Sequence, residues 1–96
     1  MISEQQDMVL IGKKPVMNYV VACLTLFNAG KETITVKARG LVISNAVDTV
    51  ELLRRSFIKD LEIQKITIGS QEYQKANGFE STVSTIDIVI SRPNKK

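Results

Sequence analysis

The chain has 96 residues, which suits one compact domain and leaves no room for a second. Hydrophobic residues make up 44% of it, enough for a globular core and unlike a disordered composition. The single cysteine, Cys23, and the absence of histidine exclude internal disulfides, thiolate metal clusters and histidine-dependent catalytic triads. The longest apolar stretch, residues 20–27, is too short to cross a bilayer, and the first residues show no signal-peptide pattern. We therefore expect a cytoplasmic protein that does not contact membranes.

The first half of the chain predicts a strand, a helix and a second strand. The apolar run at residues 8–11 is typical of a short strand. Pro15 suits the first helical position and Gly30 a C-terminal cap. Residues 33–38 alternate in polarity and are rich in β-branched side chains, which predicts a strand. The apolar residues of the helix recur at helical spacing and are Val16, Val20, Cys23, Leu24 and Phe27, with Cys23 expected as a buried, inert thiol.

The next segment predicts a second helix. Ser44 is a candidate N-cap for it. Its expected apolar stripe consists of Ile43, Val47, Val50, Leu53 and Phe57. Because Phe57 continues this stripe, periodicity alone favours a core position for it.

Two further strands complete the chain. Residues 61–70 predict a strand whose apolar positions change parity near Gln64 and Lys65, which indicates a bulge. Residues 83–90 predict the last strand, with alternate isoleucines on one face. The polar segment 71–82 between them carries Asn77-Gly78, a strong hairpin-turn signal.

The resulting order is β-α-β-α-β-β. Helices between strands imply crossover connections and helices packed on a sheet, whereas the final hairpin makes the sheet mixed. The predicted fold class is therefore α/β (α+β): a single two-layer domain over residues 1–96, with a mixed sheet and a long final hairpin. Only residues 1–7 and 93–96 are expected to be loose.

Charge is unevenly distributed along the chain. The net charge is +3, but the only acid between residues 8 and 47 is Glu32, against four lysines and one arginine. Lys13 and Lys14 lie between the first strand and the first helix, where a helix start adds free N–H groups and a positive dipole end. A phosphate site and a merely solvated turn fit this turn equally well.

A second cation, Arg39, follows the second strand. The carboxyl ends of parallel strands meet at one edge of a sheet, so Arg39 is expected on the same side of the domain as Lys13 and Lys14. Asn18 and Asn45, near the starts of the two helices, have amides that can donate to phosphate oxygens. The sequence therefore predicts a phosphate-binding surface, and the hairpin is a candidate projecting arm.

Enzyme motifs are missing. Gly12-Lys13 lacks the upstream glycine and the following Ser or Thr of a P-loop, and no glycine triplet suggests a dinucleotide site. Ser44 has no histidine to activate it. We expect no enzyme activity, no cofactor and no metal.

Several segments together resemble the Alba family of archaeal chromatin and RNA-binding proteins. They are IGKKPVMNYV, VKARG, IS and AVDTVE on either side of Asn45, RRSF, KITIGS and VSTIDIVI, in the family's order and spacing. The resemblance implies the same β-α-β-α-β-β fold, similar to the C-terminal domain of a bacterial translation initiation factor. It also implies a homodimer that binds double-stranded DNA without sequence preference, binds RNA, and associates with the chromosome.

The resemblance also assigns roles to individual residues. Lys13 and Lys14 match the paired lysines at the DNA surface, and Lys13 matches the position whose acetylation is associated with weaker binding, which implies acetylating and deacetylating enzymes. Arg39 matches a basic residue of the central surface. Phe57 matches an exposed aromatic through which dimers meet side by side on DNA. The hairpin 71–82 matches arms that reach into the minor groove.

The sequence departs from the family pattern at the same surface. Leu41 stands where many members carry arginine, and Asn45 where lysine is frequent. The hairpin offers only Lys75 against Glu72 and Glu80. These differences point to a divergent paralogue and leave two interpretations: a DNA-coating chromatin protein, or an RNA-binding subunit or chaperone of RNA–protein assemblies for which DNA is secondary.

Overall fold

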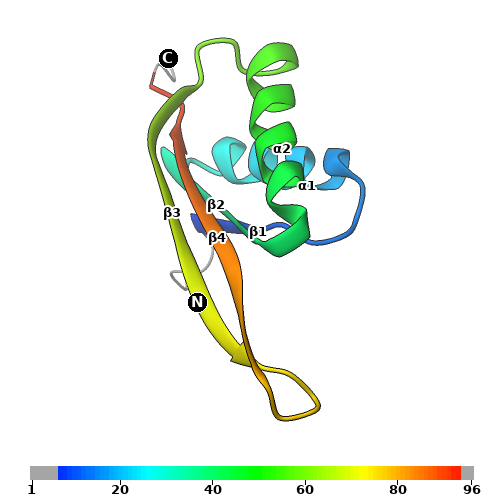
Figure 1. The fold of residues 1–96 in the computed structure, drawn as a ribbon. Helices are drawn as coiled ribbons and strands as arrows, with labels where there is room; N and C mark the ends of the chain where they lie inside the picture. Colours follow the sequence, from blue (N-terminus) through cyan, green and yellow to red (C-terminus); the bar gives the residue numbers. More distant parts are fainter. Residues whose placement is uncertain (1–6, 94–96) are drawn as a thin grey trace.

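The computed structural model describes residues 7–93. Its elements follow the predicted order, and the expected mixed α/β architecture is confirmed (Figure 1). They are β1 (Met8–Leu10), α1 (Val16–Asn28), β2 (Thr33–Arg39), the 3₁₀ turn η2 (Gly40–Val42), α2 (Ile43–Ser56), β3 (Glu62–Gln74) and β4 (Glu80–Ser91). The chain ends expected to be loose lie largely outside the described residues. Asp7, the first described residue, forms an ion pair with Lys31 at 3.2 Å.

The four strands form one sheet in the order β1-β2-β4-β3. β1 pairs with β2 in parallel, and β4 pairs with both β2 and β3 in antiparallel orientation. Both helices cover the same face of this sheet, which leaves the opposite face open (Figure 1). Inserting β4 between β2 and β3 makes β3 an edge strand and brings the hairpin beside the carboxyl end of β2.

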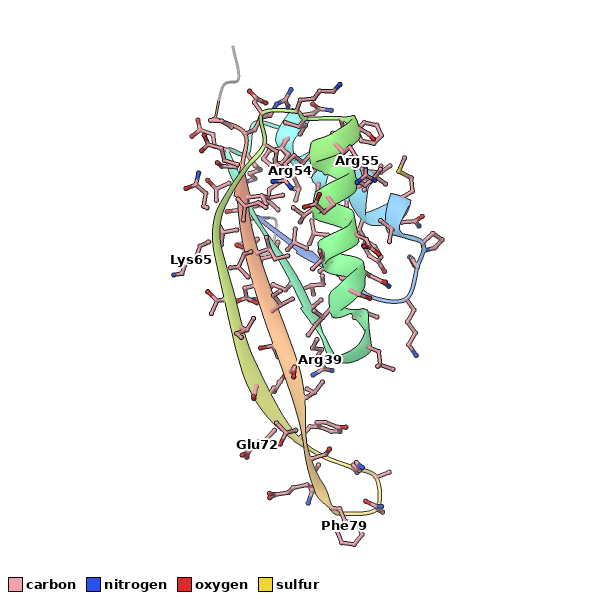
Figure 2. All side chains as sticks on the ribbon, turned by 45° about the horizontal axis from the view of Figure 1, so that its top comes forward. Arg39, Arg54, Arg55, Lys65, Glu72 and Phe79 are labelled. Carbon is pink, nitrogen blue, oxygen red and sulfur yellow. The ribbon has the colours of Figure 1, made fainter. Side chains whose placement is uncertain are left out.

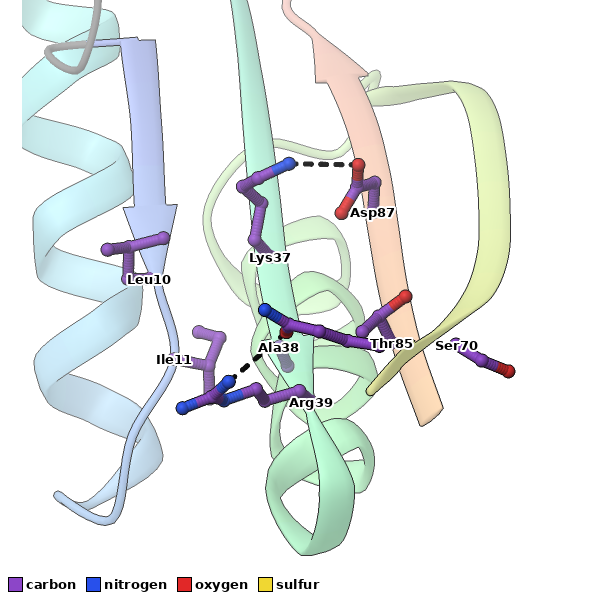
Figure 3. A pocket seen from close by; sticks show the side chains of 9 residues that line it. Leu10, Ile11, Lys37, Ala38, Arg39, Ser70, Thr85 and Asp87 are labelled. Atoms are coloured by element: carbon purple, nitrogen blue, oxygen red, sulfur yellow. Dashed lines mark hydrogen bonds and ion pairs between the residues drawn. The ribbon is translucent and has the colours of Figure 1, made fainter. Parts of the chain in front are cut away.

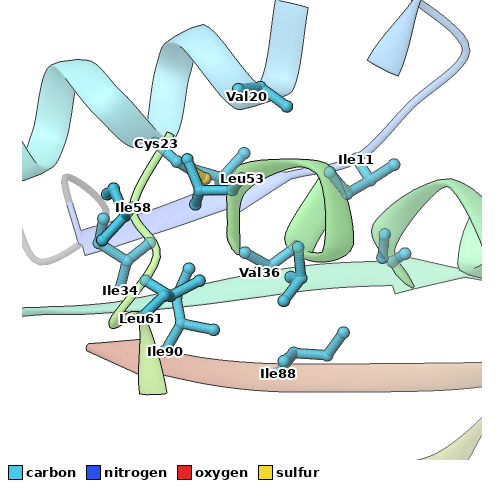
Figure 4. Close-up of a cluster of buried hydrophobic side chains, with 14 of the residues drawn as sticks. Ile11, Val20, Cys23, Ile34, Val36, Leu53, Ile58, Leu61, Ile88 and Ile90 are labelled. Carbon is cyan, nitrogen blue, oxygen red and sulfur yellow. The ribbon is translucent and has the colours of Figure 1, made fainter. Parts of the chain in front are cut away.

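The core lies between the helices and the covered face of the sheet (Figure 4). Its fully buried large side chains include Ile34, Val36, Leu53 and Ile90. Cys23 is buried among them, as expected, and burial raises the pKa of its thiol from 9.0 to about 12. The predicted alternation of β2 and β4 is confirmed, since the even-numbered apolar residues of both strands face the helices.

The C-terminal end of α1 is capped as predicted. Gly30 has a φ of +103°, a conformation that side chains disfavour. Its N–H donates to the Phe27 carbonyl at 3.0 Å, and the Lys31 N–H donates to the Leu26 carbonyl at 3.1 Å. This pair of bonds is the Schellman arrangement, which satisfies carbonyls left without partners at the helix end.

The start of α2 differs from the prediction. Ser44 is not an N-cap: α2 begins at Ile43, and the residue before it, Val42, makes no side-chain capping bond. The reason is that Gly40, at φ +64°, ends β2 and enters a 3₁₀ turn that runs directly into the helix. Ser44 therefore lies inside α2, where serine has no capping role.

The buried stripe of α2 is also shifted. Val47 is exposed, contrary to prediction, and Ala46 and Thr49 take its place in the interior. The buried hydroxyl of Thr49 donates to the Asn45 carbonyl at 2.7 Å, which avoids the cost of an unpaired buried polar group. At the helix end Ile58 enters the core, whereas Phe57 stays 45% exposed.

The long final hairpin was predicted, but its two strands extend further than expected, through residues assigned to a polar connection. The bulge is confirmed by a register shift between Ile63 and Lys65. The predicted turn is confirmed as well: Gly78 has a φ of +90°, and the Phe79 N–H donates to the Asn77 side-chain oxygen at 3.1 Å. The hairpin projects beyond the rest of the sheet as an arm, and the domain measures 52 × 32 × 23 Å (Figure 1).

Candidate nucleic-acid interface

A tyrosine hydroxyl holds the turn that carries the paired lysines. The N–H groups of Gly12 and Lys14 both donate to the Tyr19 Oη, at 2.9 and 3.1 Å. A Cβ on Gly12 would lie 3.1 Å from that oxygen, so glycine lets the hydroxyl approach closely. Lys13 and Lys14 are left exposed on a turn of fixed shape. The Tyr19 hydroxyl already accepts hydrogen bonds from two N–H groups of the turn. The turn therefore attracts anions mainly through the ammonium groups of Lys13 and Lys14.

Arg39 lies at the same edge of the sheet as this turn. The Ile11 N–H donates to the Lys37 carbonyl at 2.9 Å, which continues the parallel pairing of β1 and β2 beyond Leu10. The chain therefore leaves β1 toward Lys13 where β2 ends at Arg39. The Arg39 guanidinium is exposed, and its Nη1 donates to the Gln71 Oε1 at 3.1 Å. This bond orients the guanidinium against the base of the arm.

The cations of the domain fall into two groups. Lys31, Lys37 and Arg54 are neutralised by nearby carboxylates, and the Lys37 Nζ lies 2.9 Å from the Asp87 carboxylate. The other cations within residues 7–93 form no ion pair, and they include the candidate site residues Lys13, Lys14, Arg39 and Lys75. The four sequence-predicted cations therefore keep their charge available to an external anion.

A groove of about 550 Å³ crosses the open face of the sheet next to Arg39 (Figure 3). The Lys37–Asp87 ion pair borders it on one side, and Arg39 lies on the other (Figure 3). The remaining lining side chains are mostly small or uncharged. The net positive charge of this groove therefore comes from Arg39.

The other predicted site residues are spread over the domain. Lys14 and Asn18 line one groove of about 530 Å³ beside β1 and α1. Asn45 lies half-buried in the first turn of α2. Lys75 lies near the tip of the arm, where its N–H donates to the Phe79 carbonyl at 2.7 Å. The structure thus brings Lys14 close to Asn18, and it puts Lys75 far from both.

Three residues of this surface escaped the sequence analysis: Tyr19, Gln71 and Asp87. The helical spacing of the apolar residues gives Tyr19 no special role, because its hydroxyl bonds to a turn five and seven residues earlier in the chain. Gln71 and Asp87 meet Arg39 and Lys37 only because β4 is inserted beside β2. A sequence signal existed only for Asp87, a lone charge within an isoleucine-rich strand.

Two kinds of site are not found among residues 7–93. No cluster of carboxylate, thiol or imidazole groups there could hold a metal ion. No helix in that range is both long enough and apolar enough to span a bilayer.

Comparison with known proteins identifies the family. Residues 7–70, more than half of the chain, match the family model named Alba. The chain belongs to the Alba family. It is 45% identical over 89 residues to the DNA/RNA-binding protein Alba of Methanocella arvoryzae, an alignment that covers 93% of each chain.

Solved structures of Alba proteins have the same fold. Alba from Thermoplasma volcanium superposes with a TM-score of 0.84 at 44% identity, covering 88% of this chain and 99% of the other. ALBA1 from Trypanosoma brucei superposes with a TM-score of 0.76 over 94% of this chain and 72% of its own. At 24% identity, this second similarity concerns the fold alone.

Proposed function

We propose that this Alba protein binds double-stranded DNA and RNA through their phosphates, without sequence preference, and coats or compacts chromosomal DNA. One observation carries the proposal: Lys13 and Lys14 are exposed on a turn held by Tyr19, at the same sheet edge as Arg39, and form no ion pair within residues 7–93. Membership of the family and the relative named as a DNA/RNA-binding protein support it.

Binding in this proposal is electrostatic and needs no catalytic step. Each ammonium or guanidinium group that meets a phosphate releases condensed counterions, which favours binding at low salt. Such contacts position the protein but carry no base information. Asn18 and Asn45 supply amide donors at the margins of the surface, and Lys75 adds one cation on the arm. No cofactor or metal takes part.

The proposed assembly is a homodimer on the nucleoid of the cytoplasm. Ile66 and Ile68, on the helix-facing side of the edge strand β3, are 55% and 78% exposed and supply an apolar surface for a second copy. Phe57, half-exposed at the end of α2, would join neighbouring dimers along DNA. Acetylation of Lys13 would remove one charge from the turn and weaken binding, under the control of acetylating and deacetylating enzymes.

An alternative is that RNA is the main partner, in RNA–protein assemblies. The arm leaves room for it: Glu72 and Glu80 outnumber Lys75 there, so the arm lacks the charge for the minor-groove contact with duplex DNA that the family resemblance implies. Competition between duplex DNA and structured RNA for the same protein distinguishes the two interpretations.

The test of the main proposal is the salt dependence of binding to duplex DNA. Lys13→Ala/Lys14→Ala should weaken binding to unrelated duplexes alike. It should also reduce the slope of log K against log salt by up to about 2, since each phosphate contact contributes roughly 0.9. Lys13→Gln, which imitates acetylation, should have about half of this effect.

The matched control is Lys59→Ala/Lys65→Ala. It removes the same charge from two exposed positions away from the turn and should leave most of the slope intact. An equal loss in both double variants would mean that net charge alone drives binding and that the turn has no special role. A preference among duplexes above about 10³-fold, the lower end of specific recognition, would reveal a base-reading surface.

A further inference from the structure

A small pocket lies where the arm leaves the body of the domain. It measures about 280 Å³ and is lined by Arg39, Tyr73 and Val83. Val83 packs against the chain as it leaves β2, because a Cβ on Gly40 would lie 3.0 Å from the Val83 Cγ2. The Tyr73 side chain is 44% exposed, and its hydroxyl has no hydrogen-bond partner within residues 7–93. The pocket is thus lined by the aromatic ring of Tyr73 and the aliphatic side chain of Val83.

Arg39 supplies the charge of this pocket. One guanidinium N–H is held by Gln71 at 3.1 Å, which leaves its other donors free for a phosphate or a base edge. The arm carries Glu72, which Figure 2 shows, together with Lys75 and Glu80, so its own charge does not attract phosphates. A nucleic-acid strand that reaches the base of the arm therefore meets one cation and one aromatic ring.

We propose that this pocket binds one unpaired nucleobase, stacked on Tyr73, while Arg39 holds a phosphate of the same strand. The proposal rests on the nucleic-acid binding proposed above and deepens it by naming the class of strand. A base inside a duplex has both faces covered by its neighbours, so only an unpaired base can offer its face to the ring. Stacking of this kind is tolerant of sequence, because every base has a π-face. Single strands and loops, of RNA or DNA, are the ligands that fit.

The amino-acid composition provides a direct reporter. The chain contains two tyrosines and no tryptophan, so its near-ultraviolet emission comes from Tyr19 and Tyr73. Stacking of a base on Tyr73 should quench part of that emission when a twelve-residue oligouridylate is added to the full-length protein. Tyr73→Phe should keep the affinity, because phenylalanine also stacks, but should lose the quenching.

Two further variants test the contribution of the ring. Tyr73→Leu keeps an apolar side chain and removes the π-face, and Tyr73→Ala removes both. Each should weaken binding of the oligouridylate by at least about fivefold, the lower bound for losing one stacked base, and leave duplex binding within about twofold. Oligothymidylate, measured in parallel, distinguishes RNA from DNA. A loss of affinity for both oligonucleotides means that the pocket accepts an unpaired base of either strand type, and a loss for only one restricts the pocket to that type.

The matched control is Phe79→Ala, which removes an exposed ring from the same arm but outside the pocket. It should leave single-strand binding within about twofold. Three outcomes would each contradict the proposed base-binding pocket. They are equal losses of affinity from Phe79→Ala and Tyr73→Ala, equal losses of affinity for single strands and duplexes, and no loss of affinity for single strands.

The experiments distinguish a wrong assignment of the pocket from a protein that does not bind nucleic acid at all. If the pocket does not bind a base, the Tyr73 variants bind every strand like the wild type, and Lys13→Ala/Lys14→Ala still lowers the salt slope. If the proposed function fails, the wild-type protein itself shows no salt-dependent binding to duplex or single strand.

Discussion

The hydroxyl of Tyr19 fixes the shape of the lysine turn. It accepts two backbone hydrogen bonds, from Gly12 and Lys14, on a segment that is otherwise a short exposed connection. Two neighbouring lysines repel one another and would favour an open, variable turn. Holding their backbone in place lowers the ordering cost that binding would otherwise incur.

Tyr19→Phe removes that acceptor and leaves both lysines in place. We expect duplex affinity to fall by about 2- to 10-fold, in line with the cost of ordering a short polar segment on binding. The salt slope should stay unchanged, since no charge is lost. Titration at several salt concentrations measures both quantities. Tyr73→Phe is the control, because it removes a hydroxyl that has no hydrogen-bond partner within residues 7–93. A fall in slope for Tyr19→Phe would contradict the positioning role.

Cys23 illustrates how burial controls a single group. Desolvation in the core raises the pKa of the thiol from 9.0 to about 12, so the folded protein keeps it neutral where the unfolded chain ionises. Below about pH 9 this burial costs no stability, and between pH 9 and 12 stability falls by at most about 1.4 kcal/mol per pH unit.

The native thiol should therefore resist alkylation. Iodoacetamide at pH 8 should leave Cys23 largely unmodified in the folded protein and modify it rapidly in urea. Mass spectrometry of the quenched reaction measures both. Rapid labelling under native conditions would show that the α1 face opens to solvent far more often than its packing implies.

At the scale of elements, the C-terminal end of α2 separates two neighbouring apolar residues. The N–H groups of Phe57 and Ile58 both donate to the Leu53 carbonyl, at 3.1 and 2.8 Å, and the second of these bonds spans five residues, so the helix ends in a wide turn. That turn directs Ile58 into the core and leaves Phe57 half-exposed. Periodicity alone favoured a core position for Phe57, and it failed because the helix stops one residue before it.

Phe57→Ala should accordingly leave the melting temperature nearly unchanged and abolish cooperative coating of DNA. Ile58→Ala is the matched control: truncating a buried isoleucine costs about 2–5 kcal/mol, a large part of the stability of a small domain. Calorimetry together with binding isotherms on a long duplex measures both variants. A stability loss for Phe57→Ala comparable to that of Ile58→Ala would return Phe57 to a structural role.

At the scale of the whole molecule, the helices do not cover all of the sheet. They lie over β1, β2 and β4, whereas the same face of β3 exposes Ile66 and Ile68. An exposed apolar edge strand invites pairing or aggregation unless it is covered. In the proposed homodimer a second copy covers it.

Ile68→Glu should therefore shift the protein toward the monomer, because a charge would be buried without a partner in the dimer. Sedimentation velocity at micromolar concentration measures the shift. Leu41→Glu is the control, since Leu41 is 98% exposed beside the lysine and arginine surface and away from β3. A wild-type protein that sediments as a monomer would remove the dimer from the proposal.

Features that depend on residues close together in the chain were predictable from the sequence. They are the order of elements, the alternation of β2 and β4, the Gly30 cap and the Asn77-Gly78 turn. The start of α2 was not predictable, because a glycine-led 3₁₀ turn replaced the serine cap and shifted the buried face from Val47 to Ala46. The full extent of the two hairpin strands was also missed, because paired strands can continue through polar residues once both edges are exposed.

The sequence by itself determined the cations, their place after the first two strands, and the family resemblance that the comparisons confirmed. Only the tertiary structure decided which cations within residues 7–93 pair with carboxylates. The insertion of β4 next to β2 sets the register that pairs Lys37 with Asp87 and brings Gln71 to Arg39. The fold of α1 against β1 likewise brings Tyr19 to the lysine turn. Contacts between distant segments depend on strand order and register, which the burial of whole faces determines and local patterns do not.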